Sequence, residues 1–450
     1  MEREKFSSRL GFILTAAGCA IGLGNIYRFP YITGEYGGAI FVLIYLICIL
    51  IMGLPLIVME LAVGRGSRRS SALALQELRP DIKGWKVVQI PQVLGNYVFQ
   101  MFYTTIIAQM LYFAYAMIFG KLNGLTVQQI QSVSDSLAQD PWILGGIMVI
   151  VVLMGFIVCY SGLQKGVEKV SKIMLVILFM IMIFLAIYSL TLPGSKEGID
   201  FYLKPNFTNV KKAGLYKIVS AAFGQVFFSL GIGAGSMCIF GSYCGKESSL
   251  TGQAIQIIAL DTGVALTAGL IVFPACFTYG INPANGPDLI MITMPAVFNK
   301  MFAGQFIGSM FFVAVLMAAL STVIAAFENI VACTMDLFRW NRKKATLANI
   351  LPMIILSMPA VLGMSVWGNF NIFSRGIIEL EDFLVSNNLL PFGAMGYLFF
   401  CISRYGWGWN NFITEANAGK GAWFPRWMKK YCIYLLPIIM IVFLLIGYIG

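Results

Sequence analysis

The chain has 450 residues, of which 59% are hydrophobic and only 11% are charged, and its formal net charge is +11. A soluble protein of this length has charge on roughly a quarter of its residues, so this composition, with a mean hydropathy of +0.81, excludes an ordinary soluble enzyme or binding domain. The sequence has no histidine, and its nine cysteines show no C-x-x-C spacing, which argues against a histidine metal site and a disulfide framework.

Eleven apolar segments follow one another along the chain, each close to the ~20 residues that a helix needs to cross a ~30 Å hydrocarbon core. Only helices are expected, because lipid offers no partner for backbone polar groups and the short alternating strands of a membrane barrel are not seen. The predicted spans are 10–31, 38–63, 87–118, 142–159, 166–192, 215–243, 249–277, 303–337, 346–366, 376–403 and 431–449. The sequence therefore predicts an all-α integral membrane protein.

Lysine and arginine are distributed unevenly between the two sides of these spans. With the N-terminus in the cytoplasm, 22 of the 31 basic residues fall on the cytoplasmic side, as the positive-inside rule requires. The predicted location is the inner (plasma) membrane, with several passes, a cytoplasmic N-terminus and an external C-terminus. Nucleic-acid binding is not expected, because it would need one basic face with stacking aromatic residues, and these charges lie in separate loops.

Two spans contain glycines where a helix would cross the middle of the membrane. The first has Gly18, Gly22 and Gly24 followed by Asn25, and the sixth has Ser-Leu-Gly-Ile-Gly-Ala-Gly at 229–235. Each glycine costs a helix ~1 kcal/mol, which favours an unwound turn; the alternative for either span alone is close helix packing through small residues. Two such spans, five apart, are typical of inverted-repeat transporters with a binding site at the midplane. The predicted repeats are 10–192 and 215–403, with an extra helix at 431–449.

Unwound backbone at this depth frees carbonyl groups for a hard cation and N–H groups for a carboxylate. Side chains that bear oxygen occur near the breaks and in other spans, namely Asn25, Ser229, Asp261, Ser321 and Thr322. Oxygen ligation without clustered carboxylates favours a monovalent ion such as Na⁺ over a transition metal. For Ser321 and Thr322 alone, the alternative is a hydrogen bond to the preceding turn of an ordinary helix.

Charged residues within the spans are costly and usually functional. They are Arg28, Glu60, Asp261, Glu328 and Asp382. Arg28 and Asp382 can alternatively snorkel to an interface, whereas Glu60 and Asp261 lie well inside apolar runs. No nucleophile–base pair stands out and nothing resembles a selectivity filter, so neither an enzyme nor a channel is expected.

Six stretches of the chain carry a specific pattern. They are GCAIGLGNIYRFPY (18–31), EYGGAIFVLIY (35–45), PLIVMELAVGR (55–65), GQVFFSLGIGAG (224–235), FPA (273–275) and TMPAVF (293–298). Together they resemble the neurotransmitter:sodium symporter family, and most closely its bacterial amino-acid transporters. The resemblance covers nearly the whole chain and implies the broken-helix inverted-repeat fold, in the eleven-helix form that some bacterial members have.

The resemblance implies two sodium sites. The first would consist of the Ala20 carbonyl, Asn25, Ser229, Asp261 and the substrate carboxylate. The second would consist of the carbonyls of Gly18, Ile21 and Ala318 with the hydroxyls of Ser321 and Thr322. Animal relatives also need chloride, near positions matching Tyr45, Gln225 and Ser229, whereas bacterial relatives use a carboxylate. Asp261 is expected to supply that fixed negative charge here.

The resemblance also implies a substrate site and two gates. Tyr103 would hold the substrate carboxylate, Phe228 would form a lid, and Glu60 would brace the unwound sixth span. The expected substrate contacts are Ala20, Gly24, Phe99, Tyr103, Phe227, Phe228, Ser229, Gly231, Gly233, Ala234, Thr322 and Ala326. The expected outer gate is Arg28 with Asp382, and the expected inner gate is Arg3, Ser242, Tyr243 and Asp336. Phe6 stands where the family usually has a tryptophan in the inner plug.

The expected function is sodium-coupled symport of a zwitterionic hydrophobic amino acid into the cell by alternating access. Gly231, Ala234 and Ala326 are small, and Phe99, Phe227 and Phe228 offer aromatic surface. A bulky or aromatic substrate (tyrosine, tryptophan, phenylalanine or a large aliphatic residue) is therefore expected. The alternatives are a small aliphatic substrate and a non-transporting amino-acid sensor of the same fold. The expected partners are the amino acid, two sodium ions and the lipid bilayer, without an obligatory protein partner.

Overall fold

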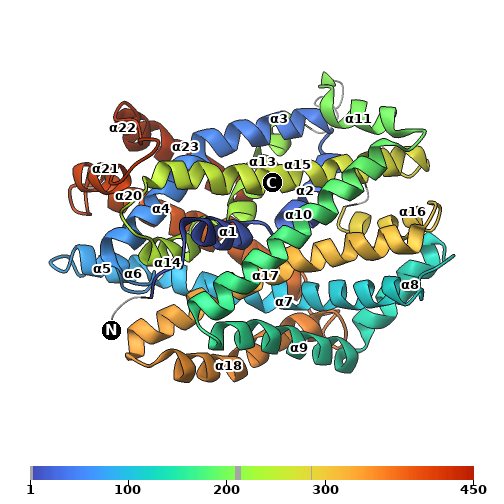
Figure 1. The fold of residues 1–450 in the computed structure, drawn as a ribbon, viewed down its shortest axis with the longest axis horizontal. Helices are drawn as coiled ribbons and strands as arrows, with labels where there is room; N and C mark the ends of the chain where they lie inside the picture. Colours follow the sequence, from blue (N-terminus) through green and yellow to red (C-terminus); the bar gives the residue numbers. More distant parts are fainter. Residues whose placement is uncertain (1–3, 208–213, 285, 450) are drawn as a thin grey trace.

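The computed structural model describes residues 4–207, 214–284 and 286–449, which form one helical bundle (Figure 1). Within that part of the chain there is no β-strand. The first half contains α1 (Arg9–Ala20), α2 (Phe29–Glu35), α3 (Ala39–Cys48), α4 (Leu54–Ser67), α5 (Ala74–Leu78), α6 (Trp85–Val88), α7 (Ile90–Ile118), α8 (Val127–Gln139), α9 (Pro141–Tyr160), α10 (Lys169–Leu190) and α11 (Ser195–Leu203).

The second half contains α13 (Leu215–Leu230), α14 (Ser236–Tyr243), α15 (Leu250–Thr278), α16 (Met294–Phe298), α17 (Gly304–Phe338), α18 (Arg342–Gly363), α19 (Ile377–Leu384), α20 (Leu390–Ile402), α21 (Trp409–Ala416), α22 (Met428–Lys430) and α23 (Leu436–Ile449). Short π-helical segments join several of these helices: η1 (Gly24–Arg28), η2 (Ile49–Gly53), η3 (Leu163–Glu168), η4 (Leu289–Thr293), η5 (Val385–Leu389) and η6 (Tyr431–Leu435).

Nine continuous segments of the described residues are long and apolar enough to cross a membrane, which confirms the predicted fold class. They are Ala39–Ser67, Trp85–Ile118, Pro141–Tyr160, Leu163–Leu190, Leu250–Thr278, Gly304–Phe338, Arg342–Gly363, Ile377–Ile402 and Met428–Ile446. Arg9–Ala20 and Gly24–Glu35 make a tenth span, bent by 51°. The remaining predicted span, 215–243, is divided into α13 of 16 residues and α14 of 8 residues. Neither is long enough to cross alone, so the count of eleven stays a prediction.

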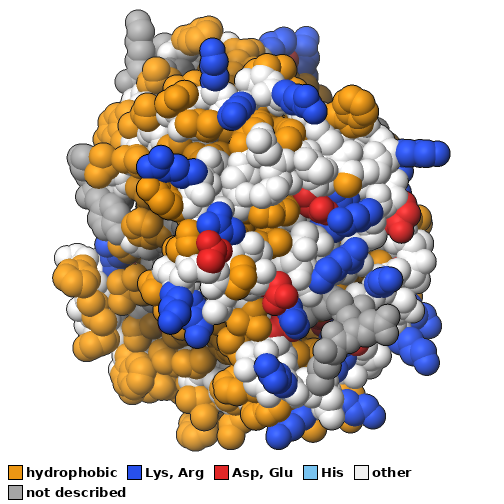
Figure 2. Space-filling model, turned by 90° about the vertical axis from the view of Figure 1, so that its left-hand side faces the viewer, with side chains coloured by type: hydrophobic (Ala, Val, Ile, Leu, Met, Phe, Trp, Pro, Cys, Tyr) orange, Lys and Arg blue, Asp and Glu red, His pale blue; other side chains and the backbone are white. Residues whose placement is uncertain are grey.

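The outside of the bundle carries apolar side chains. On α10, Ile173, Val176, Met180, Ile183 and Ile187 are at least half exposed and recur every three or four residues, which places them on one face of the helix. Such a stripe is unfavourable in water and favourable against lipid. Lysine and arginine gather instead on the end of the bundle that holds α5, α6, α21 and the start of the chain (Figure 2). This is the predicted cytoplasmic end.

The first span breaks between α1 and η1. The backbone leaves the helix at Ile21, which is extended with φ −71° and ψ 98°, and it resumes at Gly24. No side chain fits at Gly22, because a Cβ there would lie 2.5 Å from Thr322 Oγ1 and 2.7 Å from Tyr103 Oη. The break therefore brings bare backbone against α7 and α17.

The second break, between α13 and α14, depends on three glycines with left-handed backbone. Gly231, Gly233 and Gly235 have φ angles of 59°, 90° and 82°, a region that other residues rarely adopt. The buried Glu60 carboxylate on α4 accepts hydrogen bonds from the N–H groups of Gly233 at 2.9 Å and of Met237 at 3.1 Å. Glu60 thus satisfies N–H groups that the start of α14 would otherwise leave without a partner.

The two breaks come together in the middle of the bundle. The helix α17 packs along α7, α1 packs against α17, α14 packs against α4, and η1 lies against α15. The first break contacts α7 through Leu23 and Tyr103 and contacts α17 through Ile21 and Thr322. The second break contacts α17 through Ala234 and Asn329. The candidate site lies where these segments meet, and Figure 1 shows α7 and α17 as long, continuous helices.

Candidate functional site

Three carbonyl groups and two hydroxyl groups converge where the end of α1 meets α17. The Thr322 hydroxyl lies 3.2 Å from the carbonyl oxygen of Ile21 and 3.4 Å from those of Gly18 and Ala318. The Ser321 hydroxyl lies 3.4 Å from the Ile21 oxygen and 2.8 Å from the Ala318 oxygen. Oxygen ligands lie ~2.3–2.6 Å from a bound Ca²⁺ ion. Two such oxygens that form a right angle at the ion are ~3.3–3.7 Å from each other. These five oxygens are the ones expected at the second sodium site. The two hydroxyls also donate to the Ala318 carbonyl in the preceding turn of α17, as the alternative expected, so the sodium site stays a prediction.

Asn25, Ser229 and Asp261 form another buried polar cluster, beside the first break. Asn25 Nδ2 donates to the Asp261 carboxylate and to the Asp261 carbonyl, each at 2.8 Å. Ser229 Oγ donates to the same carboxylate at 3.0 Å, and Asn25 Oδ1 accepts from the Gly22 N–H at 3.1 Å. The structure thus brings together the side chains expected at the first sodium site. Their carboxylate has no cationic partner among these contacts, so it offers negative charge to a bound ion.

A small central cavity lies between the broken spans, α7 and α17, and it has a volume of about 30 Å³. That volume holds one or two water molecules. Nine of the twelve expected substrate contacts line it, namely Ala20, Gly24, Phe99, Tyr103, Phe228, Gly231, Ala234, Thr322 and Ala326. The cavity therefore coincides with the predicted substrate site, and a substrate larger than a few atoms must expand it.

The Tyr103 hydroxyl gives one wall of the cavity a hydrogen-bond donor. The hydroxyl is buried, and its oxygen accepts a hydrogen bond from the Leu23 N–H at 3.1 Å. Its own O–H can rotate to donate to an acceptor in the cavity. The neighbouring backbone of Gly22 and Gly24 carries no side chain. A substrate carboxylate that approaches the hydroxyl here must first widen this closely packed region.

Three expected substrate contacts do not line the cavity. Phe227 points towards α23 and stacks on Phe443, with ring centroids 5.6 Å apart, because consecutive side chains on a helix point about 100° apart and Phe228 takes the cavity side. Gly233 faces α20, where a Cβ would meet the backbone of Leu390. The Ser229 hydroxyl points to Asp261. These three residues do not line the cavity in this structure, and their contact with a substrate stays a prediction.

Sequence reasoning also missed part of the lining. The additional residues are Cys19, Gly22, Asn96, Ser236 and Leu390. Asn96 lies seven residues before Tyr103 on α7, and this spacing of two helical turns was the available signal. Ser236 and Leu390 gave no such signal, because they reach the cavity only through the path of the second break and the packing of α20.

An ion pair and two aromatic rings close the side of the cavity that faces away from the basic end. Phe228 packs edge-to-face on Phe99, with ring centroids 5.8 Å apart, and the Arg28 guanidinium lies 4.4 Å from the centre of the Phe228 ring, a cation–π contact. Arg28 Nη1 lies 3.8 Å from Asp382 Oδ1. Ser386, which the sequence did not indicate, accepts from Arg28 at 3.4 Å and donates to Asp382 at 2.8 Å.

A cluster of aromatic rings lies on the opposite side, near the start of the chain. The Phe6 ring centre lies 5.6 Å from that of Phe12, 6.2 Å from that of Phe240 and 5.8 Å from that of Tyr243. The N-terminal segment therefore packs against α1 and α14 at this end. Phenylalanine occupies, with a smaller ring, the place where the resemblance implies a tryptophan.

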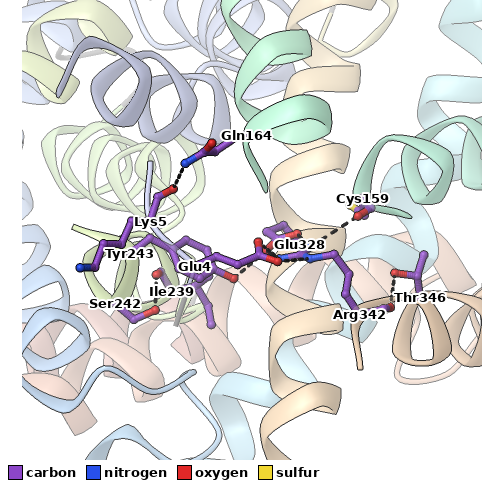
Figure 3. Close-up of polar contacts among 10 residues, drawn as sticks. All are labelled: Glu4, Lys5, Cys159, Gln164, Ile239, Ser242, Tyr243, Glu328, Arg342 and Thr346. Atoms are coloured by element: carbon purple, nitrogen blue, oxygen red, sulfur yellow. Dashed lines mark hydrogen bonds and ion pairs between the residues drawn. The ribbon is translucent and has the colours of Figure 1, made fainter. Parts of the chain in front are cut away.

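Beside this cluster lies a buried ion-pair network that the sequence did not predict (Figure 3). Arg342 Nη1 lies 2.5 Å from Glu328 Oε2, and Arg342 Nη2 donates to Glu328 Oε1 at 2.9 Å. Glu4 accepts from the same guanidinium at 3.0 Å and 2.7 Å, and the Tyr243 hydroxyl donates to Glu328 at 2.6 Å. The network links the N-terminal segment, α14, α17 and α18.

The inner-gate residues that the resemblance implied lie near this network. Ser242 and Tyr243 are buried at the end of α14, and the Asp336 carboxylate accepts from the Ser70 N–H at 2.6 Å. Arg3 lies outside the described residues, so its part in the gate stays a prediction.

The family model for the sodium:neurotransmitter symporter family matches residues 3–130 and 125–449 of the chain. A sodium-dependent transporter of Haemophilus influenzae is 30% identical over 452 aligned positions, which cover 98% of this chain and 97% of that protein. The sodium-dependent transporter YhdH of Bacillus subtilis is 33% identical over 451 positions, which cover 98% of each chain.

Among solved structures, that of MhsT in complex with L-phenylalanine superposes with a TM-score of 0.88 at 33% identity, covering 99% of this chain and 100% of that one. The family is one of sodium-coupled transporters, not of enzymes. Because the family match, the relatives and the helical fold with its two breaks agree over nearly the full sequence, the chain belongs to the sodium:neurotransmitter symporter family and is a sodium-dependent symporter.

Proposed function

We propose that this symporter carries a zwitterionic, bulky or aromatic amino acid into the cell together with two sodium ions. The observation that carries the proposal is the convergence, next to the cavity, of the Ser321 and Thr322 hydroxyls on backbone carbonyls at the end of the first helix and in α17, with hydroxyl–carbonyl distances of 2.8–3.4 Å. The cluster around Asp261 supports a second ion close by. Both clusters include groups from the first break. An ion bound in either cluster therefore stabilises the conformation in which the first break packs against the other helices of that cluster.

The cavity lining supports an amino-acid substrate. The Tyr103 hydroxyl accepts from the Leu23 N–H and can donate its own hydrogen to a carboxylate, and the same carboxylate can complete the shell of the ion beside Asn25. Phe99 and Phe228 meet edge-to-face and present a surface against which an aromatic ring packs well. MhsT, similar over the whole chain, has been solved with L-phenylalanine, which further supports this class of substrate.

The cavity volume favours a second candidate, a small aliphatic substrate. A volume of about 30 Å³ is far below the ~300–1,000 Å³ of ordinary ligand pockets. A bulky substrate therefore requires the glycine-rich second break or the Phe228 ring to move. The three left-handed glycines at that break make such a movement less costly than in a regular helix.

Alternating access follows from the two closures. The Arg28–Asp382 pair with the Phe228 ring blocks one side of the cavity, while the Phe6 cluster and the Arg342 network block the other. Transport requires that each side open in turn while the other stays shut. Because substrate and sodium share one ligand shell, the binding of each strengthens the binding of the other by the same factor. An inside-negative potential adds ~2.3 kcal/mol per charge per 100 mV.

Uptake into proteoliposomes tests the proposal. Radiolabelled tyrosine, phenylalanine, leucine and alanine would be offered with an inward Na⁺ gradient, with K⁺ replacing Na⁺, and with an imposed inside-negative potential. We expect concentrative uptake of the bulky amino acids that disappears without Na⁺ and rises with the potential. Uptake driven equally by a proton gradient without Na⁺ would contradict the coupling. Sodium-dependent binding without any uptake would indicate a sensor, and selective uptake of alanine would indicate the small-substrate alternative.

The basic end of the bundle (Figure 2) supports an orientation with the N-terminus in the cytoplasm of the cell's inner membrane. Protease or biotin access to a short tag at each end of the chain, in intact cells, tests this orientation. Labelling of an N-terminal tag from outside would contradict it.

A further inference from the structure

The cavity has a polar end that the proposed function does not use. Asn96 of α7 lines the cavity and is only 2% exposed. It lies seven residues before Tyr103, which corresponds to ~10 Å along the helix. A substrate whose carboxylate binds near Tyr103 therefore extends its side chain towards Asn96.

The orientation of the Asn96 amide is determined by its surroundings. Its nitrogen donates to the Gln92 carbonyl at 2.7 Å and also to the Ala234 carbonyl. Both partners are acceptors, so only the NH₂ group can face them, and both of its hydrogens are used. The amide oxygen is left as the atom that Asn96 offers to the cavity, because both hydrogen bonds that Asn96 makes to described residues use its nitrogen.

Ser236 adds a second polar group to this end of the cavity. It is the first residue of α14, is 4% exposed and lines the cavity. Its oxygen lies 3.5 Å from Asn329 Nδ2, which also donates to the Ala234 carbonyl at 3.1 Å. Ser236 therefore lies beside the same carbonyl group that orients Asn96, and its hydroxyl hydrogen can be directed to a ligand.

We infer that Asn96 and Ser236 select a side chain that ends in a hydrogen-bond donor, and that tyrosine is bound in preference to phenylalanine. The phenolic hydroxyl donates to Asn96 Oδ1 and accepts from Ser236 Oγ, while the ring packs between Phe99 and Ala326. This inference rests on the proposed function and narrows it. Tryptophan, whose indole N–H donates but cannot accept, ranks second.

The energetic reason is the cost of an unsatisfied buried acceptor. When phenylalanine fills the cavity, it displaces water from Asn96 Oδ1 and offers nothing in return. A buried polar group left without a partner costs ~1–3 kcal/mol, and sites built around a substrate hydroxyl reject the analogue that lacks it more strongly than they reject a change of size. We therefore expect tyrosine to bind about 5- to 150-fold more tightly than phenylalanine.

Competition binding on the purified full-length chain in nanodiscs tests this inference. Radiolabelled L-tyrosine would be displaced, in saturating Na⁺, by unlabelled tyrosine, phenylalanine and O-methyltyrosine. O-methyltyrosine keeps the acceptor oxygen and lacks the donor hydrogen, so we expect it to bind no better than phenylalanine. This comparison uses only the wild-type chain and does not depend on any variant folding.

Two matched variants then test the residue. Asn96→Leu removes the acceptor, and we expect the tyrosine-to-phenylalanine affinity ratio to fall towards one. Asn329→Leu removes the other donor to the Ala234 carbonyl and the donor to Ser236 Oγ but leaves Asn96 in place, so we expect the ratio to fall no further than in Ser236→Ala, even if both affinities drop. Ser236→Ala should lower the ratio partially.

The outcomes separate this inference from the proposed function. Equal binding of tyrosine and phenylalanine by the wild type, or equal losses for both in Asn96→Leu, overturns the role of Asn96 and leaves an aromatic-amino-acid symporter intact. Absence of Na⁺-dependent binding of any aromatic amino acid, with alanine bound instead, overturns the proposed substrate class itself.

Discussion

Breaking the buried ion pair between Arg342 and Glu328 should open the inner side of the transporter. The Glu328 carboxylate is fully buried and Arg342 is 10% exposed, and their closest atoms are 2.5 Å apart. The pair joins α17 to α18 and, through Glu4, to the N-terminal segment (Figure 3). Arg342→Gln leaves the Glu328 charge buried, with the Tyr243 hydroxyl still donating to it.

The expected size of the effect follows from this burial. Removing one partner of a buried ion pair costs ~3–5 kcal/mol, whereas the other side of the network, Glu4, is 40% exposed and such pairs contribute ~0–1 kcal/mol. If the pair exists only while the inner side is closed, a loss of ~3 kcal/mol shifts the closed–open equilibrium by up to ~150-fold. Glu4→Gln should shift it by less than about fivefold.

Labelling of a cysteine at position 242 reports this equilibrium. Ser242 is buried on the inner side, and the nine native cysteines are all buried, so a membrane-impermeant thiol reagent should react with Ser242→Cys mainly in the inward-open state. We expect Arg342→Gln and Glu328→Gln each to accelerate labelling strongly. The double variant should accelerate labelling by less than the two single variants combined, because it leaves no unpaired buried charge. Labelling rates as low as in Glu4→Gln would refute the idea that this pair holds the inner side closed.

Four further outcomes are expected. Replacing chloride by gluconate should leave uptake unchanged, and Asp261→Ser should impair uptake with partial recovery in chloride; a wild type that stops in gluconate contradicts the role of Asp261 as a fixed negative charge. Thr322→Val should raise the Na⁺ concentration for half-maximal uptake about tenfold, because the loss of one ligand costs ~1.4 kcal/mol of binding free energy. An unchanged Na⁺ concentration would show that Thr322 is not a sodium ligand. Asp382→Ala should reduce uptake more than equilibrium Na⁺ binding; if neither changes, the ion pair with Arg28 is not a gate. Ala234→Phe combined with Ala326→Ile should weaken tyrosine binding more than alanine binding by ~1–3 kcal/mol, and equal losses in the competition assay would count against a bulky-substrate cavity.

The positions of the spans could be predicted closely, because the thickness of the hydrocarbon layer sets their length. The expected segment 142–159 is helical from Pro141 to Tyr160, and 303–337 is helical from Gly304 to Phe338. The ends follow local signals: Asp140 caps α9 by accepting from the N–H groups of Trp142 and Ile143. The breaks were also visible, since glycine runs in apolar segments have few other uses.

The resemblance predicted which residues would bind sodium, and the fold brings the oxygens of these residues together. Ser321 and Ile21 are 300 positions apart in the chain, yet their oxygens lie in one cluster. The residues alone indicated only that oxygen-bearing side chains occur at similar depth. The pairing of particular carbonyls with particular hydroxyls depends on how α1 is rotated against α17, and the patterns of the separate helices do not contain that rotation.

The amino-acid sequence by itself determined the membrane class, the helical fold and the two unwound segments, because hydrophobic length and glycine placement act within single segments. Only the tertiary structure decided which faces of those segments meet. It turned Phe227 towards α23 instead of the cavity, placed Asn96 with its oxygen free for a ligand, and paired Glu328 with Arg342. Each outcome depends on the rotation and register of packed helices, which are set by the fit of many side chains at once.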